Sequence, residues 1–252
     1  MESFTLTRVE MSSLLLSLTG ESDHTPLHIL QNAWGKLHRQ EMKEGTSLSA
    51  LLTTDIPAIL QKIIRGGKAK GLSLQEIAAL GALIEYSTIS ITAMQNWVKR
   101  DFKEYLGAPR EGKKYSINQA AMLFMIEDLK SSLDFQSIRR LFCKLFLKPE
   151  QDDDDLLKPV ELYGAYALLF EENREAGGQA EERKPEPLRD RLWSGGRLAL
   201  AAEQAVCQLS HLNPPQRETV RNSLLIAAVS VQACYFQALA RQYFNASLFL
   251  DF

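Results

Sequence analysis

Apolar residues recur at helical spacing through most of this 252-residue chain, and the strict alternation typical of half-buried strands is almost absent. For example, a stripe of Leu27, Leu30, Trp34 and Leu37 follows Pro26, a residue that suits the first turn of a helix. The periodicity predicts an all-α protein with one short β-hairpin. With 45% hydrophobic residues, the chain can bury a core in one large or two small domains.

Local signals place the expected helices. Ser73 followed by Glu76 is the pattern of a capping box, and Ser90 and Ser116 are N-cap residues for the next two helices. Glycines at 66 and 67 end an earlier helix. The predicted helices cover residues 26–40, 56–64, 74–86, 90–104, 117–133, 135–146, 156–175, 197–211 and 215–244.

Two stretches interrupt the helical pattern. Pro149, the acidic run Asp152 to Asp155 and Pro159 predict a boundary, because adjacent like charges repel and gain little from packing. Residues 177–196, rich in glycine, proline and charge, predict a flexible acidic loop. We therefore expect three regions: N-terminal helices at 1–71, a central domain at 72–148 and a C-terminal helical region at 149–252.

Charge is distributed unevenly along the chain. The net charge is only −2, but residues 56–116 hold ten Lys or Arg against five Asp or Glu. Residues 149–190 reverse this balance, with thirteen acids against five bases. The basic stretch is the part that we expect to meet an anionic partner.

Cysteine use and hydropathy bear on the compartment. Cys143, Cys207 and Cys234 are odd in number and far apart, which argues against a disulfide framework or a metal site and favours the cytoplasm. Residues 222–240 carry no charge, a length that would suit a membrane span. Five of these nineteen residues are Asn, Ser or Gln, so a helix buried in protein is the prediction, with no membrane partner.

The central region predicts helix, turn, helix and a basic hairpin at 107–116. The second helix is two-sided, because an apolar face could dock on the domain while amides and ammonium groups could contact base edges and phosphates of a major groove. The candidate DNA-binding residues are Thr92, Gln95, Asn96, Lys99, Arg100 and Lys103 on the helix, and Arg110, Lys113, Lys114 and Tyr115 in the hairpin.

A family resemblance supports this interpretation. The stretch from Ile91 to Lys99, followed by Pro109 and by Lys113-Lys114-Tyr115-Ser116, resembles the bacterial family of domain of unknown function 1836. That family is similar to the MerR winged helix-turn-helix, and the likeness covers residues 72–147. It implies a transcriptional regulator of double-stranded DNA.

The resemblance includes one departure. Residues 89–91 and 112–115 stand where MerR-like proteins have their turn and their basic wing. The usual Leu-Arg-Tyr-Tyr of the recognition helix is replaced by residues 94–97, Met-Gln-Asn-Trp, so its phosphate-binding arginine is missing. Gln95, Lys99 and Arg100 are the candidates to replace that arginine.

Two functions of different classes remain open. The first is a homodimeric transcriptional regulator paired through its C-terminal helices, with residues 224–239 as the candidate surface. The second is a non-catalytic protein-interaction module on a degenerate MerR-like fold without DNA affinity, which the missing arginine and the acidic segment favour. Whether a small-molecule effector binds is left open. No convergent acid, base or nucleophile is evident, so neither an enzyme nor a cofactor is expected.

Overall fold

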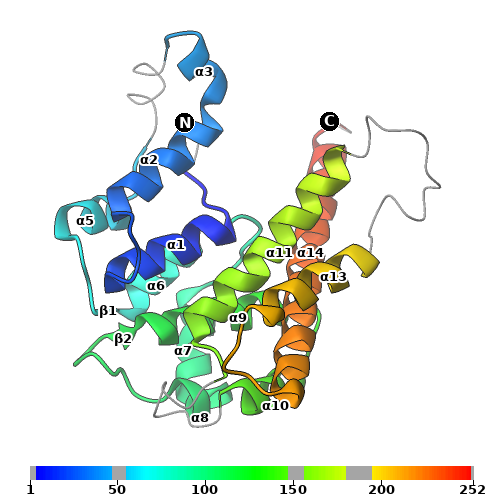
Figure 1. Cartoon of the computed structure of the whole chain (residues 1–252). Helices are drawn as coiled ribbons and strands as arrows, with labels where there is room; N and C mark the ends of the chain where they lie inside the picture. Colours follow the sequence, from blue (N-terminus) through cyan, green and yellow to red (C-terminus); the bar gives the residue numbers. More distant parts are fainter. Residues whose placement is uncertain (1–3, 47–54, 147–155, 180–194, 251–252) are drawn as a thin grey trace. The chain divides into compact units, whose positions relative to one another are not determined.

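The computed structural model describes residues 4–46, 55–146, 156–179 and 195–250 (Figure 1). It confirms a mainly helical protein with one small two-stranded sheet. The chain forms two compact units, Met1–Phe124 and Met125–Phe252, which we call unit 1 and unit 2.

Unit 1 is a set of short helices around a two-stranded sheet. Its elements are α1 (Arg8–Thr19), α2 (Pro26–Leu37), α3 (Arg39–Lys43), α5 (Ala58–Gly66), β1 (Gly71–Leu72), α6 (Leu74–Gly81), α7 (Ile91–Asn96), the π-helical turn η1 (Trp97–Asp101), α8 (Lys103–Leu106), β2 (Tyr115–Ser116) and the start of α9 (Ile117–Leu129).

The core of unit 1 forms because apolar faces of successive helices meet. Helix α1 packs on α2, α2 on α5, and α5 on α6. Met11, Leu14 and Leu15 on α1 and Ile77 and Leu80 on α6 are fully buried. The sheet joins segments far apart in sequence, because β1 pairs antiparallel with β2.

Unit 2 is built from longer helices. They are the end of α9, α10 (Phe135–Leu145), α11 (Pro159–Gln179), α13 (Gly195–Cys207) and α14 (Pro214–Leu250). Helices α11, α13 and α14 pack on one another, and α10 packs on α14. In the core, the Tyr166 hydroxyl donates a 2.7 Å hydrogen bond to Asp128 Oδ2, so this buried carboxylate has a partner.

Helix α14 changes character along its 37 residues. Leu224, Ala228 and Val231 are buried within unit 2, whereas residues 241–250 are all exposed. By length and composition α14 could cross a membrane, with 39% of its most apolar window buried, and buried helices of soluble proteins share that property. Part of the 224–239 surface therefore belongs to the core of its own unit.

Several element boundaries differ from the sequence-based expectations. Helix α6 ends at Gly81 rather than near residue 86, α9 ends at Leu129 rather than 133, and α14 continues to Leu250. Helix α1 and strand β1 were not expected. The acidic run 152–155 and most of the expected loop at 177–196 lie outside the described residues, although 177–179 and 195–196 belong to α11 and α13.

Candidate nucleic-acid interface

Helix α6, the first helix of the predicted helix-turn-helix, begins with the capping box expected from the sequence. The Ser73 hydroxyl accepts from the Glu76 N–H at 3.2 Å, and Glu76 Oε2 accepts from the Ser73 N–H at 2.7 Å. The helix ends at Gly81, where a Cβ would lie 2.6 Å from Ile89 Cγ2 and 3.0 Å from a ring carbon of Phe124. Glycine thus allows the following turn to lie close against α6 and α9.

The turn between α6 and α7 is braced by the N-terminal segment. The Leu6 N–H donates to the Leu83 carbonyl at 2.7 Å, and the Glu85 N–H donates to the Leu6 carbonyl at 3.0 Å. The buried Arg8 guanidinium donates to the Glu85 carbonyl at 2.9 Å. These bonds replace helical ones after Gly81, which explains why α6 ends earlier than its sequence pattern predicted.

The second helix of the motif, residues 91–106, is made of three pieces. We call α7, η1 and α8 together the recognition helix. The Ser90 hydroxyl caps it by accepting from the Ala93 N–H at 3.2 Å, as expected. The prediction of one continuous helix at 90–104 was wrong, because the Phe102 N–H bonds to the Trp97 carbonyl, five residues back, at 2.9 Å.

The side chains in and beside this π-turn differ sharply in their burial. Met94 and Phe102 are completely buried and Trp97 nearly so, whereas Lys99 and Arg100, which lie inside the π-turn, are exposed. π-Turns inside helices occur frequently at functional sites. Here Phe102 lies in the core while the basic residues Lys99 and Arg100 before it stay at the surface.

A tight hairpin carries the basic residues of the wing, which we call the wing hairpin (107–116). Glu111 and Lys114 exchange two backbone hydrogen bonds, of 2.9 and 3.1 Å, around Gly112 and Lys113. Gly112 has φ +68°, which favours glycine in such two-residue turns. The turn therefore holds the exposed Lys113 and Lys114 at the tip of a fixed structure.

Strand β2 joins the wing hairpin to strand β1. Gly71 faces Ser116 and Leu72 faces Tyr115 in the ladder. A Cβ on Gly71 would lie 2.6 Å from the Tyr115 carbonyl oxygen, so glycine is needed for this close pairing. Partial burial raises the pKa of the Tyr115 phenol, which keeps it a neutral hydrogen-bonding group.

Gln119 at the start of α9 fixes the wing hairpin to the recognition helix. Its amide nitrogen donates to the carbonyls of Leu106 and, at 2.8 Å, Ala108. Its amide oxygen accepts from the N–H of Ser116 at 2.8 Å and of Arg110 at 3.4 Å. The side chain is fully buried, so one amide satisfies backbone groups on both sides of the loop.

All ten candidate DNA-binding residues lie in unit 1. Seven are exposed, namely Thr92, Gln95, Lys99, Arg100, Lys103, Lys113 and Lys114, and three are half-buried, namely Asn96, Arg110 and Tyr115. Their acidic neighbours are Asp101, Glu104 and Glu111, of which the last two are exposed. Basic residues thus outnumber acidic ones on these two elements.

Sequence reasoning missed the contributions that come from outside the motif. The brace from Leu6 and Arg8 and the pairing of β1 with β2 had no signal in periodicity, since each involves only two or three residues. The Thr7–Glu10 capping box of α1 is a signal that could have found that helix.

Metal ligands do not gather anywhere in the described parts of the chain, where no three His, Cys, Asp or Glu side chains form a group that could hold an ion. Cys143, Cys207 and Cys234 are free thiols, the first two exposed and the third buried.

Comparison with known proteins places the chain in a family. The family model described as domain of unknown function (DUF1836) matches residues 71–166, which begin at β1 and include the recognition helix and the wing hairpin. The uncharacterized protein YkrK of Bacillus subtilis (strain 168) is 34% identical over 248 residues, which cover 96% of this chain and 97% of YkrK. The chain belongs to the DUF1836 family. The likeness to YkrK extends through both units, and no solved structure gives a significant match.

Proposed function

We propose that this DUF1836 protein is a cytoplasmic, DNA-binding transcriptional regulator with a MerR-like winged helix-turn-helix. The recognition helix would contact a promoter and the wing hairpin would contact the adjacent backbone. The observation that carries the proposal is the two-sidedness of the recognition helix, in which Met94 and Trp97 are buried while Gln95 and Lys99 are exposed.

The exposed groups match what duplex DNA offers. The amides of Gln95 and Asn96 can pair with the donor and acceptor edge of an adenine in the major groove. The ammonium groups of Lys99 and Lys103 can neutralise phosphates, and each such contact releases counterions and makes binding salt-dependent. A helix with this composition can therefore combine base contacts with backbone contacts.

The arrangement of elements adds support. A helix-turn-helix followed by a hairpin is the order of a winged domain, and here β1 and β2 close the motif on itself. Gln119 holds the end of the recognition helix and the wing hairpin in one geometry. A fixed relation between these two elements is what contacts to a groove and its flanking phosphates require.

Gln95 stands where the MerR pattern has its phosphate-binding arginine. Lys99 and Arg100, one turn later, supply positive charge in its place, and both are exposed. A glutamine carries no charge but can bond an adenine through both ends of its amide, so it suits a base contact better than a phosphate contact. We therefore expect the helix to rely on Gln95 for base contacts and on the later residues for phosphates.

The test is a DNA-binding titration with genomic fragments, including the protein's own promoter, at two salt concentrations. The variant Lys99→Ala/Lys113→Ala/Lys114→Ala removes three exposed cations from the proposed interface. The matched control Lys43→Ala/Arg140→Ala/Lys144→Ala removes three exposed cations elsewhere in the two units. Both variants carry the same change in net charge.

The interface variant should bind more weakly than wild type, and the slope of log K against log salt should become shallower by about 0.9 for each phosphate that the variant no longer neutralises. The control should keep the wild-type slope. Equal weakening of both triple variants would show that only net charge matters, and would refute the assigned interface.

The C-terminal end of α14 supports pairing of two copies. Phe249 and Leu250 are each 80% exposed, and Tyr243 is 70% exposed, on a stretch where no residue is buried. Exposed apolar surface of this kind marks an interaction site, and a two-fold dimer would double the contacts with a palindromic site. The pairing surface we propose is residues 236–250 rather than 224–239.

The second candidate is an interaction module without DNA affinity. The exposed carboxylates of Glu104 and Glu111, next to the proposed contacts, and the apolar end of α14 favour it. Absence of wild-type binding to every fragment at low salt would select this function over the first.

A further inference from the structure

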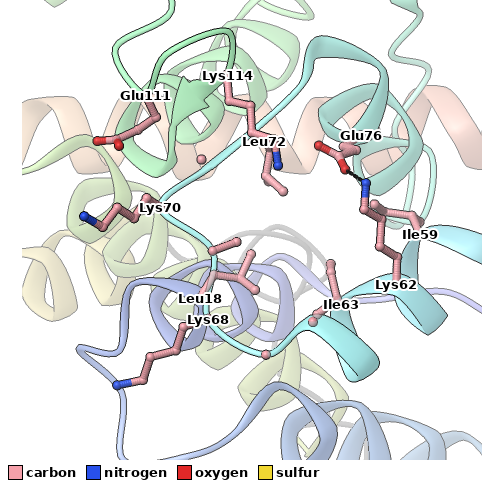
Figure 2. Close-up of a pocket in the computed structure, with 14 residues that line it drawn as sticks. Leu18, Ile59, Lys62, Ile63, Lys68, Lys70, Leu72, Glu76, Glu111 and Lys114 are labelled. Atoms are coloured by element: carbon pink, nitrogen blue, oxygen red, sulfur yellow. Dashed lines mark hydrogen bonds and ion pairs between the residues drawn. The ribbon is translucent and has the colours of Figure 1, made fainter.

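Unit 1 contains a cavity of about 470 Å³ beside the wing hairpin (Figure 2). The end of α1, the inner side of α5, the loop that follows it, strand β1 and the hairpin all contribute to its wall. Its volume lies in the range of cavities that bind small molecules. Glu76 of α6 also lines the cavity, and all of these segments lie within residues 18–114 of one compact unit.

The cavity has an apolar floor and a basic rim. The floor is formed by four apolar side chains, each with most of its surface buried: Leu18, Ile59, Ile63 and Leu72. The rim holds four lysines and two glutamates, an excess of two positive charges: Lys62, Lys68, Lys70, Lys114, Glu76 and Glu111. An apolar surface bordered by charged groups suits a small amphipathic ligand.

Both carboxylate oxygens of Glu76, one of the two glutamates, already have partners within the protein. Glu76 Oε1 forms an ion pair with the Lys62 ammonium, while Oε2 accepts from the Ser73 N–H. Burial alone would raise the pKa of Glu76, but the bonds from Lys62 and Ser73 and the nearby charge of Lys114 hold that pKa below its ordinary value. Glu76 thus stays charged and keeps Lys62 in place.

The Lys114 ammonium, unlike the Glu76 carboxylate, is available to a ligand. Lys114 is exposed, and Figure 2 shows its ammonium next to Leu72 and turned toward the opening opposite Lys62. Within the described ranges this ammonium has no hydrogen-bonded partner, although it interacts electrostatically with the Glu76 carboxylate. Figure 2 shows the Lys68 and Lys70 side chains on another side of the opening with their ammonium groups pointing away from it, where they add positive potential at the rim.

We propose that this cavity binds a small organic monoanion, a carboxylate on a short apolar chain. The carboxylate accepts hydrogen bonds from Lys114 and from the Lys62 ammonium, and the chain covers Leu18, Ile63 and Leu72. An inorganic anion leaves the floor unused, and a neutral molecule leaves the ammonium of Lys114 without a counter-charge. The site therefore selects for both properties together.

The consequence for regulation rests on the proposed function. Lys114 belongs to the wing hairpin, so a bound carboxylate withdraws its ammonium from a DNA phosphate. Ligand and DNA then weaken each other by the same factor, as linkage requires. The anion acts as an inducer that releases the regulator from DNA.

The first experiment uses the full chain without DNA. Calorimetric titration compares hexanoate with its neutral isostere hexanamide and with inorganic phosphate. Hexanoate should saturate with a Kd of about 1 mM, as its few atoms allow, and each of the other two should bind at least about tenfold more weakly. Hexanamide binding as tightly as hexanoate would overturn the assignment of an anion site.

Variants locate the site. Lys62→Gln and Lys114→Gln should each weaken hexanoate at least about fivefold, whereas Lys43→Gln, an exposed lysine on α3, should leave it unchanged. Thermal unfolding checks that each variant is folded. If Lys62→Gln disturbs the first turn of α6, where Glu76 lies, the result for Lys114→Gln alone tests the site. Unchanged affinity in Lys114→Gln would refute the proposed site.

The second experiment adds DNA. Saturating hexanoate should weaken DNA binding of the wild type at least about fivefold, within the range of couplings between sites, and hexanamide should not. If hexanoate binds through Lys114 but no DNA fragment binds, the proposed function fails while the cavity assignment stands. If DNA binds and hexanoate does not, the cavity assignment fails alone. Binding of both without mutual weakening refutes the regulatory step.

Discussion

Replacing Gln119 by leucine should destabilise unit 1 more than any exposed substitution in the same motif. Leucine has a similar size but removes all four hydrogen bonds of the buried amide, three of them short. At about 1 kcal/mol for each of the three short bonds, the free energy of unfolding should fall by about 3 kcal/mol. With a urea m-value of about 2 kcal/mol/M, the midpoint should fall by about 1.5 M.

Tryptophan fluorescence can follow unit 1 specifically. Trp34 and Trp97 lie in unit 1, and a Trp193→Phe background removes the third tryptophan of the chain. The control is Gln75→Leu on α6, an exposed amide whose removal should change stability by less than about 0.5 kcal/mol. Equal midpoints for the two variants would refute the idea that Gln119 holds this region together.

A companion variant, Gln119→Glu, tests the donor side of the amide. The glutamate keeps the acceptor for the Ser116 N–H, but its second oxygen faces the carbonyls of Leu106 and Ala108. Those carbonyls favour the protonated form, so the folded-state pKa is raised. The variant should therefore regain stability as pH falls through that raised pKa toward the unfolded-state value.

Three further outcomes follow from the structure. The variant Glu76→Gln should be less stable than wild type at neutral pH, because it lacks the carboxylate that the folded state stabilises. As the pH falls below 4.5, the ordinary pKa of a glutamate, and then through the lowered pKa of Glu76, the difference in free energy of unfolding between the two proteins should vanish in urea denaturation. A pH-independent difference would contradict this. Gly81→Ala should destabilise by about 1–2 kcal/mol, because crowding against Ile89 outweighs the gain in helix propensity, and a stabilised variant would argue against that close contact. Removing residues 241–252 should convert a dimer into a monomer in analytical ultracentrifugation, and an unchanged mass would exclude this pairing surface.

The parts of the fold that local chemistry determines were predictable from sequence. The cap at Ser90, the capping box of Ser73 with Glu76, and the start of α2 at Pro26 all formed as expected. Each depends on groups within one helical turn, so no knowledge of the remaining chain is needed.

Features that depend on distant residues could not be predicted in the same way. The end of α6 at Gly81 depends on backbone bonds to Leu6, far away in sequence. The π-turn is hidden because Val98 and Phe102 have the four-residue spacing of an ordinary helical stripe. Helix α1 carries the buried stripe Met11, Leu14, Leu15 and Leu18, but Val9 and Leu16 on its other sides make the helical pattern less clear in the sequence.

The candidate site likewise has a part that was predictable from local sequence and a part that was not. Which residues of the recognition helix face outward was predictable, since Met94 and Trp97 mark its buried side. The cavity was not predictable from the sequence. Lys62 on α5 and Lys114 in the wing hairpin line the same cavity only because β1 pairs with β2. The glycines at 66 and 67 identify the end of α5 but not the pocket that follows it.

The pairing of Gly71 with Ser116 also has a consequence for how this family can diversify. Residues 71–116 begin and end at this pairing, so the two ends of the segment lie side by side. Segments with adjacent ends can be exchanged between related proteins with little change in the path of the remaining chain. A chimera that carries residues 71–116 of another family member should therefore fold if its turn accepts the backbone of Leu6. Such exchanges would replace the proposed DNA-contacting residues and leave the rest of the chain unchanged.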